Sequence, residues 1–504
     1  MNRISLLSSI ICLLNFGSIF SQSVVTSPPI YQLMYSDEPI DIDGLDSESI
    51  WKQTQIAADF ILTSPVDNAK PSRNTEVRMV HDHTFLYVLA TCFDDDDYII
   101  QTLKRDAFGS SDEFAILIDP VGNKASGYGF GVNAMNAQSE VIISAANTDG
   151  SWDNRWYSAV TRHSDHWMVE MKIPLKSIRY KDDITDWRVN FVRIDPGSNE
   201  QSVWSPVPRQ FDFQDIGFYG TMRWDVAPKK ASGNISLIPY TSLRYDKTAT
   251  ESKGKLQAGG DAKIALSSSL NLDLTSFSDF SQVEVDVQVT NLTRFNIFFP
   301  ERRQFFIENN DIFNNFGQGA DQAFYSRRIG LDPSGQPIPI LYGARLTGNV
   351  SESLRIGTFN MQTQNISNQG ADNFSAFAFQ QRVFTRSQVR GIFLNRQGWK
   401  DGGFASSDYG RNAGGDFLYT SDDGKIVTSM GYIHSFKNSE SKSQNGQLYG
   451  GVAYNGQNFR AYIEAQHVGK NYFSDMGFNG RIENYDPDND QIVRIGYTNV
   501  GSMI

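Results

Sequence analysis

The sequence predicts an all-β protein with two parts, a jelly-roll-like β-sandwich followed by an antiparallel, barrel-like domain. Composition is the first observation: 12% of the 504 residues are aromatic, with 34 Phe and 21 Tyr, and 41 residues are Gly. This mixture favours strands over helical bundles. The second observation is that short apolar segments alternate with turn residues over 36–225. The third is a longer alternation of apolar and polar residues over 234–504.

Charge and cysteine content exclude several classes of protein. The formal charge is −12, which argues against a broad basic surface and therefore against a nucleic-acid partner. Only 20% of residues are charged and 40% are hydrophobic, so the chain has enough apolar surface to fold. Two cysteines are too few for a disulfide scaffold or a cysteine-rich zinc protein.

Residues 1–21 are predicted to be a secretory signal peptide. Arg3 supplies the positive charge, residues 4–20 are apolar or small, and Ser21 stands at the expected cleavage site. Cleavage there removes Cys12 and leaves Cys92 as the single thiol. The mature protein is therefore expected to be exported without an internal disulfide.

Residues 36–225 contain short strands separated by turn residues, the spacing of a β-sandwich. The clearest predicted strands are Thr75–Val80, Thr84–Phe93, Glu113–Ile118 and Trp187–Ile194. Residues 226–233, which contain Pro, Lys, Ser and Gly, are predicted to form a linker to the second domain.

Residues 234–504 alternate over longer segments. Lys263–Thr275 places Ile and Leu on one face and Ser, Asn and Asp on the other, as one strand would, and Phe459–His467 alternates in the same way. Hairpin turns are predicted at Asp423-Gly424 and Asn455-Gly456. These features are typical of an outer-membrane-type barrel, and a large soluble antiparallel sheet is the alternative.

The end of the sequence differs from that expectation in one respect. Outer-membrane barrels usually finish on a strand with a terminal aromatic residue, whereas this sequence ends Gly501-Ser502-Met503-Ile504. We therefore expect the barrel-like domain to be incomplete, with an unpaired strand edge.

An ordered set of short motifs runs through the first domain. The motifs are Ile42-Asp43-Gly44, Trp51, Leu86-Tyr87-Val88, Asp94, Ser111-Asp112-Glu113, Asp119-Pro120, Trp167 with Glu170, and Ile173-Pro174. In this order they resemble the family 9 carbohydrate-binding modules. The resemblance implies a β-sandwich that binds oligosaccharide or polysaccharide, often with structural calcium.

A second ordered block lies in 279–348. It comprises Asp279–Glu284, Asn291–Phe295, Phe298–Arg302, Phe305–Glu308, Tyr325–Gly330 and Gly343–Gly348. The block resembles an uncharacterised envelope family of Bacteroidetes type in which such a module precedes a barrel-like outer-membrane domain. The resemblance implies a location in the outer membrane or cell envelope, with outer-membrane lipid as a partner.

The match to the carbohydrate-binding family departs at two positions. Sugar-binding members carry Trp three residues before the aspartate that corresponds to Asp112, and Glu three residues after it. Here those positions are Gly109 and Ala115. The aromatic grip on a sugar ring is therefore not kept in its usual form.

A sugar site needs flat aromatic faces for the C–H side of the ring and polar groups for its hydroxyls. Trp152 follows Gly150 in a predicted loop and is the candidate exposed platform. Alternatively, these tryptophans pack in the core. The candidate sugar-binding residues are Trp152, Asp153, Trp156, Asn190, Arg193, Glu200 and Trp204.

Four consecutive carboxylates, Asp94, Asp95, Asp96 and Asp97, follow a predicted strand. Calcium binds oxygen ligands, so these residues are the candidate site for structural calcium. A solvated acidic loop is the alternative.

Glu301 and Glu308 are the candidate catalytic residues, because glycoside hydrolysis uses paired carboxylates. Arg302 and Arg303 lie close in sequence, so a paired ionic network is the alternative.

The sequence favours carbohydrate binding at the envelope, in polysaccharide use and without bond cleavage. A glycoside hydrolase or hydrolase-associated protein is the first alternative, and a structural or transport barrel capped by the sandwich is the second.

Overall fold

The structure is a computed structural model, and it describes most of the chain from residue 28 onward. The described residues are 28–504 except 95–97, 108, 110, 123, 125, 145–147, 151, 153, 179, 181–183, 229–234, 248–251, 268, 278–297, 300, 302, 308, 320, 333–337, 352, 366–369, 401, 439–442, 481, 487–488 and 490. Several predictions lie outside them: the signal peptide, the motifs at 279–284 and 291–295, and the candidates Asp95–Asp97, Asp153 and Glu308.

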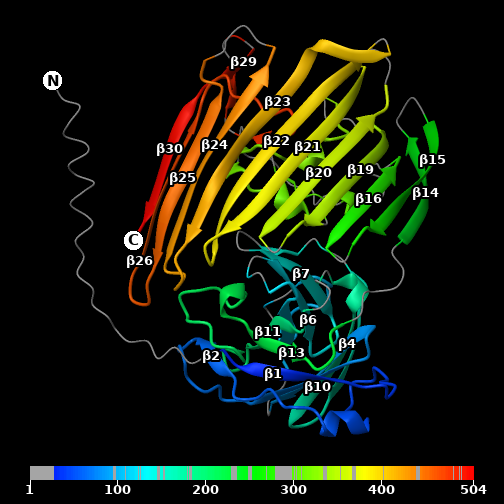
Figure 1. Cartoon of the computed structure of the whole chain (residues 1–504), viewed down its shortest axis with the longest axis vertical. Helices are drawn as coiled ribbons and strands as arrows, with labels where there is room; N and C mark the ends of the chain where they lie inside the picture. The colour runs from blue at the N-terminus through cyan, green and yellow to red at the C-terminus, as the bar shows by residue number, and fades with distance from the viewer. Residues whose placement is uncertain are drawn as a thin grey trace, which may run out of the picture.

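The all-β prediction is confirmed, with two large sheets stacked along the long axis of the molecule (Figure 1). The first sheet has 13 strands in the order β8-β7-β6-β5-β11-β13-β1-β3-β4-β10-β9, and β12 pairs with β11 and β2. These strands are β1 (Ile30–Tyr35), β2 (Ile61–Ser64), β3 (Thr75–His81), β4 (Phe85–Phe93), β5 (Glu113–Asp119), β6 (Ser126–Asn133), β7 (Gln138–Ser144), β8 (Thr148–Asp149), β9 (Tyr157–Arg162), β10 (His166–Pro174), β11 (Asp186–Asp195), β12 (Glu200–Val203) and β13 (Gly220–Trp224).

This sheet folds over on itself to form a sandwich. β1 is the connecting strand, because it pairs in parallel with β13 on one side and with β3 on the other. One core joins the two layers: Phe114 and Phe191 from one layer pack in the same cluster as Val88 and Val169 from the other. Alternate side chains of each strand point into this core, which is why the short apolar segments of the sequence form strands here.

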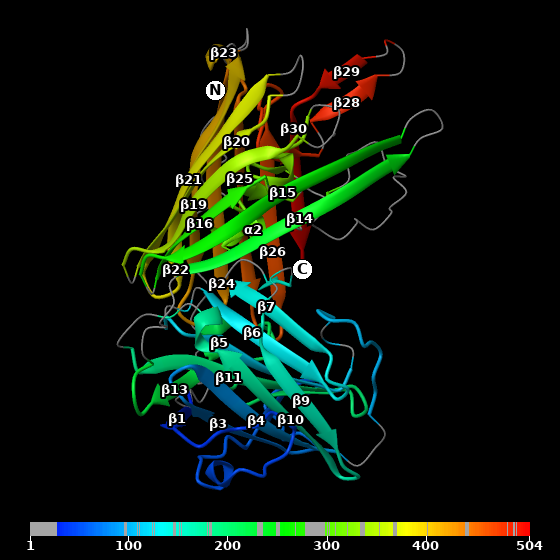
Figure 2. The same ribbon diagram turned by 90° about the vertical axis from the view of Figure 1, so that its right-hand side faces the viewer.

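The second sheet has 12 antiparallel strands in the order β14-β15-β16-β19-β20-β21-β22-β23-β24-β25-β26-β30. The sheet is strongly curved, as Figure 2 shows. Its strands are β14 (Ile235–Lys247), β15 (Ser252–Ala265), β16 (Leu270–Ser276), β19 (Ile340–Asn349), β20 (Leu354–Thr363), β21 (Ala371–Val383), β22 (Ser387–Lys400), β23 (Gly403–Thr420), β24 (Ile426–Lys437), β25 (Gly446–Asn455), β26 (Arg460–Val468) and β30 (Tyr497–Met503).

Described residues from 298 onward, between β16 and β19 in sequence, lie outside this sheet and pack against its concave side. Phe305 and Phe313 pack in one buried cluster with Phe359 and Phe374 of the strands. The short elements of this segment are α2 (Gln304–Ile307), η5 (Asn310–Ile312), β17 (Gly317–Gln318), β18 (Asp321–Gln322) and η6 (Ser326–Arg328). Between β26 and β30 lie β27 (Phe478–Asn479), which pairs with β18, and the hairpin of β28 (Glu483–Asp486) and β29 (Gln491–Arg494). The curled sheet therefore encloses a packed core.

Along the later strands of the curled sheet, exposed and buried side chains alternate. On β24 Met430 and Tyr432 are exposed, whereas Ile433 and Ser435 are buried. Large apolar side chains are exposed on neighbouring strands as well, namely Phe377, Phe393, Phe417, Phe436, Leu448, Val452, Tyr454, Tyr462 and Ile463. We call this convex side the outer face. No helix in the described part of the chain is long and apolar enough to cross a membrane.

The prediction of one strand over Lys263–Thr275 is wrong, because the chain turns between β15 and β16. The Ser267 hydroxyl accepts hydrogen bonds from the backbone N–H groups of Ser269 (3.2 Å) and Leu270 (3.0 Å). Serine hydroxyls compete with strand pairing in this way. The predicted turn at Asp423-Gly424 is confirmed: it joins β23 to β24, and Gly424 has a φ of +72°.

The two sheets meet where a loop of the sandwich contacts turns of the curled sheet. Arg386, in the turn between β21 and β22, donates from Nη2 to both carboxylate oxygens of Asp215, at 2.7 and 2.9 Å. Its guanidinium also lies 5.5 Å from the ring of Phe218. The sandwich is therefore held against one end of the curled sheet.

Candidate functional site

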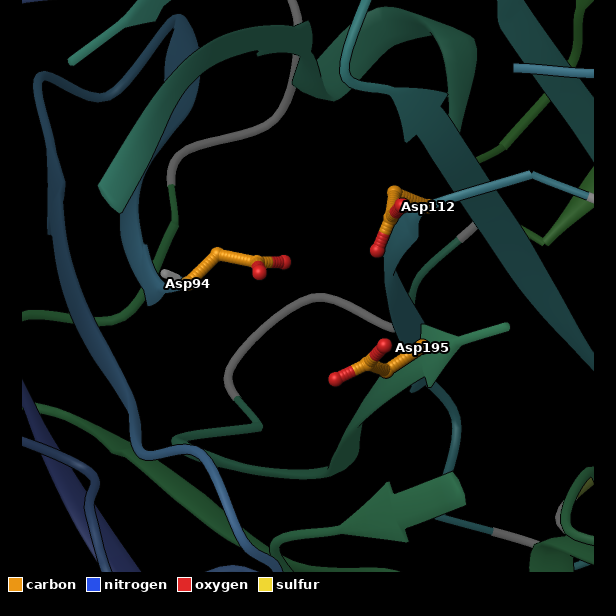
Figure 3. A group of neighbouring side chains, drawn as sticks. All are labelled: Asp94, Asp112 and Asp195. Carbon is orange, nitrogen blue, oxygen red and sulfur yellow. The ribbon is translucent and has the colours of Figure 1, made fainter. Parts of the chain in front are cut away.

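Three strand ends of the sandwich bring together three buried aspartates. Asp94 follows β4, Asp112 precedes β5, and Asp195 ends β11, which pairs with β5 so that Ile194 lies opposite Glu113. Figure 3 shows the three carboxylates pointing toward one another. One oxygen of each lies within 4.8 Å of the others, and all three residues are buried.

Two guanidinium groups lie among these carboxylates. Arg193 Nη2 is 2.8 Å from Asp94 Oδ2 and 3.8 Å from oxygens of both Asp112 and Asp195. Arg73 Nη1 is 3.0 Å from Asp94 Oδ1 and 3.1 Å from Asp195 Oδ2. We call these five residues the aspartate–arginine cluster. Buried charges need partners of this kind, since an uncompensated charge in the interior is costly.

The cluster holds one more carboxylate than guanidinium groups, and Asp112 is the least compensated of the three. The Ile99 N–H donates to its Oδ2 at 2.7 Å, whereas its buried Oδ1 has no hydrogen-bond partner among the described residues. Burial raises the pKa of Asp112 to about 6. Burial acts the same way on Asp195, but the Ser198 N–H and Arg193 outweigh it and hold the pKa of Asp195 below its usual value.

The arrangement of the cluster does not fit calcium. A calcium ion takes 6 to 8 oxygen ligands, whereas both oxygens of Asp94 already contact guanidinium groups and Arg73 also contacts Asp195. Asp94 is therefore an ion-pair residue, and Asp95–Asp97 lie outside the described residues. The calcium site expected over Asp94–Asp97 stays a prediction, because three of its four residues are not among those that the structure describes.

The expectation that Trp152 is an exposed aromatic platform for a sugar ring is wrong. Trp152 is 3% exposed and lies among aromatic rings, 5.1 Å from Tyr128 and 5.7 Å from Phe130 between ring centroids. Trp156 is 4% exposed, and its Nε1–H donates to Glu140 at 3.1 Å. Trp204 is 7% exposed. The alternative interpretation of these tryptophans, as core residues, matches their positions.

Three of the polar candidates have structural contacts. Asn190 is fully buried and pairs with the backbone of Ser205, accepting at 2.7 Å and donating at 3.0 Å. Glu200 accepts from the N–H and hydroxyl of Ser72, at 2.9 and 2.8 Å. Arg193 belongs to the aspartate–arginine cluster. The polar groups of these three candidates are therefore engaged by loops and by other buried charges.

The two departures from the carbohydrate-binding pattern have local explanations. Ala115 is buried in a cluster with Val207, Ile216 and Tyr219, which cover its face of the sheet. Gly109 has a φ of +103°, a conformation that a tryptophan would rarely adopt. The position of Ala115 is therefore covered by the segment between β12 and β13.

Glu301 lies in an ionic network, as the alternative interpretation expected. Its carboxylate contacts Arg303 Nη2 at 2.8 Å and accepts from the Ser326 hydroxyl at 2.6 Å. Arg303 in turn donates to the backbone carbonyls of Ser326 and Ile329, each at 2.8 Å. Glu301 is thus part of the packing inside the curled sheet.

Sequence reasoning missed the grouping of Arg73, Asp112 and Asp195 with Arg193 and Asp94. One signal was available: Arg193 and Asp195 are two residues apart on a strand and therefore share one face. Asp94 and Arg73 reach the end of β11 only through the long-range order of the strands, which no local sequence pattern predicts.

The first domain is similar to a known carbohydrate-binding family. Residues 42–223 match the family described as carbohydrate family 9 binding domain-like. Two solved structures of a family 9 carbohydrate-binding module from Caldicellulosiruptor kristjanssonii are also similar. The complex with glucose is 17% identical, with a TM-score of 0.29, and covers 41% of this chain and 100% of its own. The complex with cellotriose is 18% identical, with a TM-score of 0.30, and covers 40% and 100%.

No curated protein matches the chain. The second domain, with the curled sheet and its packed interior, matches a family profile over residues 233–497, more than half of the chain. The chain therefore belongs to the family described as domain of unknown function DUF5916.

Proposed function

We propose that this chain is an outer-membrane protein whose sandwich binds carbohydrate at the cell envelope, in polysaccharide use. One observation carries the proposal: a single chain joins a domain similar to the family 9 carbohydrate-binding domains, over 42–223, to a 12-stranded sheet with an apolar outer face. The sheet anchors the chain in lipid, and the sandwich meets the polysaccharide in water. The signal peptide predicted at 1–21 provides export.

The distribution of charge in the curled sheet supports the anchoring step. Arg390 and Asp416 pair inside the sheet, with Nε to Oδ1 at 2.7 Å, and both are buried. The guanidinium group of Arg396 lies 2.8 Å from Asp372, 2.7 Å from Asp408 and 2.9 Å from Asp475. Strands with apolar residues outside and paired charges inside suit a lipid-facing sheet.

The experiment uses the full chain made in a Gram-negative host. We expect it in the outer-membrane fraction, with a gel mobility that changes on heating, and we expect heat of binding with cello- or xylo-oligosaccharides in detergent. A processed chain that is soluble and monomeric without detergent would overturn the anchoring step. The absence of heat with every sugar would overturn carbohydrate binding.

We infer binding without bond cleavage. Of the two candidate acids, Glu301 is engaged by Arg303 and Ser326, and Glu308 lies outside the described residues. A glycoside hydrolase requires one carboxyl group to donate a proton and a second to act as base or nucleophile. Release of reducing sugar by the full chain, abolished by Glu301→Gln, would establish the enzyme alternative instead.

The contact between the domains favours a second candidate function, in which the sandwich caps a transport barrel. Besides the pair of Arg386 with Asp215, Arg460 Nη2 donates to the backbone carbonyl of Arg209 at 3.2 Å. Liposome swelling separates the candidates. Solute entry that increases when Arg386→Glu weakens the contact supports the cap, whereas unchanged entry and retained sugar binding support the first proposal.

A further inference from the structure

A cavity of about 570 Å³ lies between the sandwich and the turn that joins β25 to β26. Asp67, Arg209 and Gln210 line it from the sandwich, and residues 457–460 line it from the turn. In Figure 1 this turn reaches down beside the part of the sandwich that carries β2. Its volume lies within the roughly 300–1,000 Å³ typical of ligand sites.

The contacts in the cavity hold its walls together without neutralising its charges. The Arg209 N–H donates to Asp67 Oδ1 at 3.3 Å, and Arg460 Nη2 donates to the Arg209 carbonyl at 3.2 Å. Both bonds use the backbone of Arg209. The guanidinium group of Arg209 has no ion pair among the described residues. Arg209 and Arg460 are both exposed.

Three side-chain amides also line this cavity. The amide of Gln210, with those of Gln457 and Asn458, can donate to and accept from a polar ligand.

The cavity also contains an aromatic face. Phe459 is 51% exposed and lines the cavity beside Arg460. An exposed ring of this kind stacks on the C–H side of a sugar ring, while neighbouring amides and charges bind its hydroxyls. The cavity thus contains the residue types that a sugar site needs, whereas the tryptophans of the sandwich are buried in its core.

We propose that this cavity binds an acidic oligosaccharide, with the carboxylate of a uronic acid between the guanidinium groups of Arg209 and Arg460. This inference rests on the proposed carbohydrate binding and specifies its site and its sugar class. Guanidinium groups bind carboxylates through two parallel hydrogen bonds. Asp67 can accept from sugar hydroxyls, and it repels the single charge of a uronate less strongly than the double charge of a phosphate dianion, which favours a saccharide over a phosphate ligand.

The test is calorimetric titration of the full chain in detergent with a xylo-oligosaccharide that carries glucuronic acid and with the neutral oligosaccharide of equal length. We expect the acidic sugar to bind at least tenfold more tightly, and Arg209→Gln to remove that preference. Phe459→Ala weakens binding of both sugars. The matched control is Arg162→Gln, because Arg162 is an exposed arginine at the end of β9 and does not line the cavity.

The outcomes separate this inference from the proposed function. Equal affinity for the two sugars, or an unchanged preference in Arg209→Gln, overturns the inference and leaves carbohydrate binding intact. No heat with either sugar overturns carbohydrate binding itself. Inorganic phosphate that displaces the acidic sugar, with Arg209→Gln abolishing phosphate binding, would assign the cavity to phosphate instead. Tryptophan fluorescence checks that each variant is folded, because all 8 tryptophans except Trp399 lie in the sandwich.

Discussion

Arg193 Nη2 lies 2.8 Å from Asp94 Oδ2, and the side chains are only 2% and 1% exposed. The sequence assigned these residues to two different sites, one for sugar and one for calcium. The structure joins them in one buried network that connects the ends of β4 and β11. Their chemistry is therefore used to hold two layers of the sandwich together.

Replacing Arg193 with methionine should strongly destabilise the sandwich. The substitution keeps much of the side-chain volume but leaves three buried carboxylates with Arg73 as the single remaining guanidinium of the cluster. Removing one partner of a buried ion pair lowers the free energy of unfolding by about 3–5 kcal/mol. Denaturant unfolding of the full chain, followed by tryptophan fluorescence, measures the change.

The control is Arg162→Met, which should change the free energy of unfolding by less than about 0.5 kcal/mol, because Arg162 is exposed. Adding Asp94→Asn to Arg193→Met should restore part of the lost stability, since it removes one of the unpaired charges. An Arg193→Met variant as stable as the unchanged protein would show that the network is not a structural support.

Removal of divalent cations should leave the unfolding midpoint of the sandwich unchanged. The guanidinium groups of Arg73 and Arg193 already contact the carboxylates that a cation would need. The measurement is thermal unfolding with EDTA or with added calcium, followed by tryptophan fluorescence. A midpoint that falls with EDTA, and a fall that Asp112→Asn abolishes, would instead place a cation in the cluster.

Stability of the sandwich should decrease as pH rises from about 4.5 to about 7. Burial raises the pKa of Glu170 from 4.5 to about 7, and burial also raises the pKa of Glu113 to about 7. In this window the unfolded chain ionises these groups while the folded chain keeps them protonated. The folded state then binds more protons, so the free energy of unfolding falls with pH and levels off above about 7.

Glu170→Gln tests the contribution of one of these groups. Oε2 of Glu170 accepts from the N–H groups of Asp43 and Gly44, each at 2.9 Å, and the glutamine oxygen can replace it. The variant should show a shallower pH dependence and gain on the order of 1–3 kcal/mol relative to the unchanged protein at pH 8. Glu170→Ala, which removes the acceptor, should instead be less stable at pH 4.5. An unchanged pH slope in Glu170→Gln would contradict the assignment.

Much of the fold could be predicted because strand patterns are local. The strand predicted at Glu113–Ile118 is β5, and the turn at Asp423-Gly424 joins β23 to β24. The boundary at Leu266–Leu270 could not be predicted by alternation, because the serines at 267 and 269 fit the polar face of a strand as well as a turn. Only the hydroxyl hydrogen bonds decide between them.

The candidate sites were less predictable, because burial depends on contacts distant in sequence. Trp152 lies two residues after Gly150, and its ring is buried against Tyr128 and Phe130 of β6. The cavity at Arg209 and Phe459 joins residues 250 positions apart, and neither belongs to a motif. Sequence patterns therefore identified strands and residue types, whereas tertiary contacts determined which residues share a site.

Charge reversal of Arg386 should release the sandwich from the curled sheet. In the unchanged protein, Arg386 Nη2 lies 2.7 Å from Asp215. Arg386→Glu replaces this guanidinium group with a second carboxylate close to that of Asp215, and like charges at such short distances repel. With a protease site inserted in the predicted linker at 226–233, the cleaved halves of the unchanged protein should purify together in detergent, and those of the variant should separate. Lys400→Glu, at the far end of β22 from Arg386, is the matched control. Co-purification of the Arg386→Glu halves would show that other contacts hold the domains.

Arginine at Met430 should prevent stable insertion of the curled sheet if its outer face contacts lipid. Met430 is 65% exposed in the middle of β24, beside exposed apolar residues of neighbouring strands, and an arginine at the centre of a bilayer costs about 2–4 kcal/mol. The measurement is the fraction of chain in the outer membrane whose gel mobility changes on heating. Asp422→Arg, which adds the same side chain in the exposed turn before β24, should insert normally. Equal insertion of both variants would mean that the outer face does not meet lipid at Met430, because the same charge would then cost nothing there.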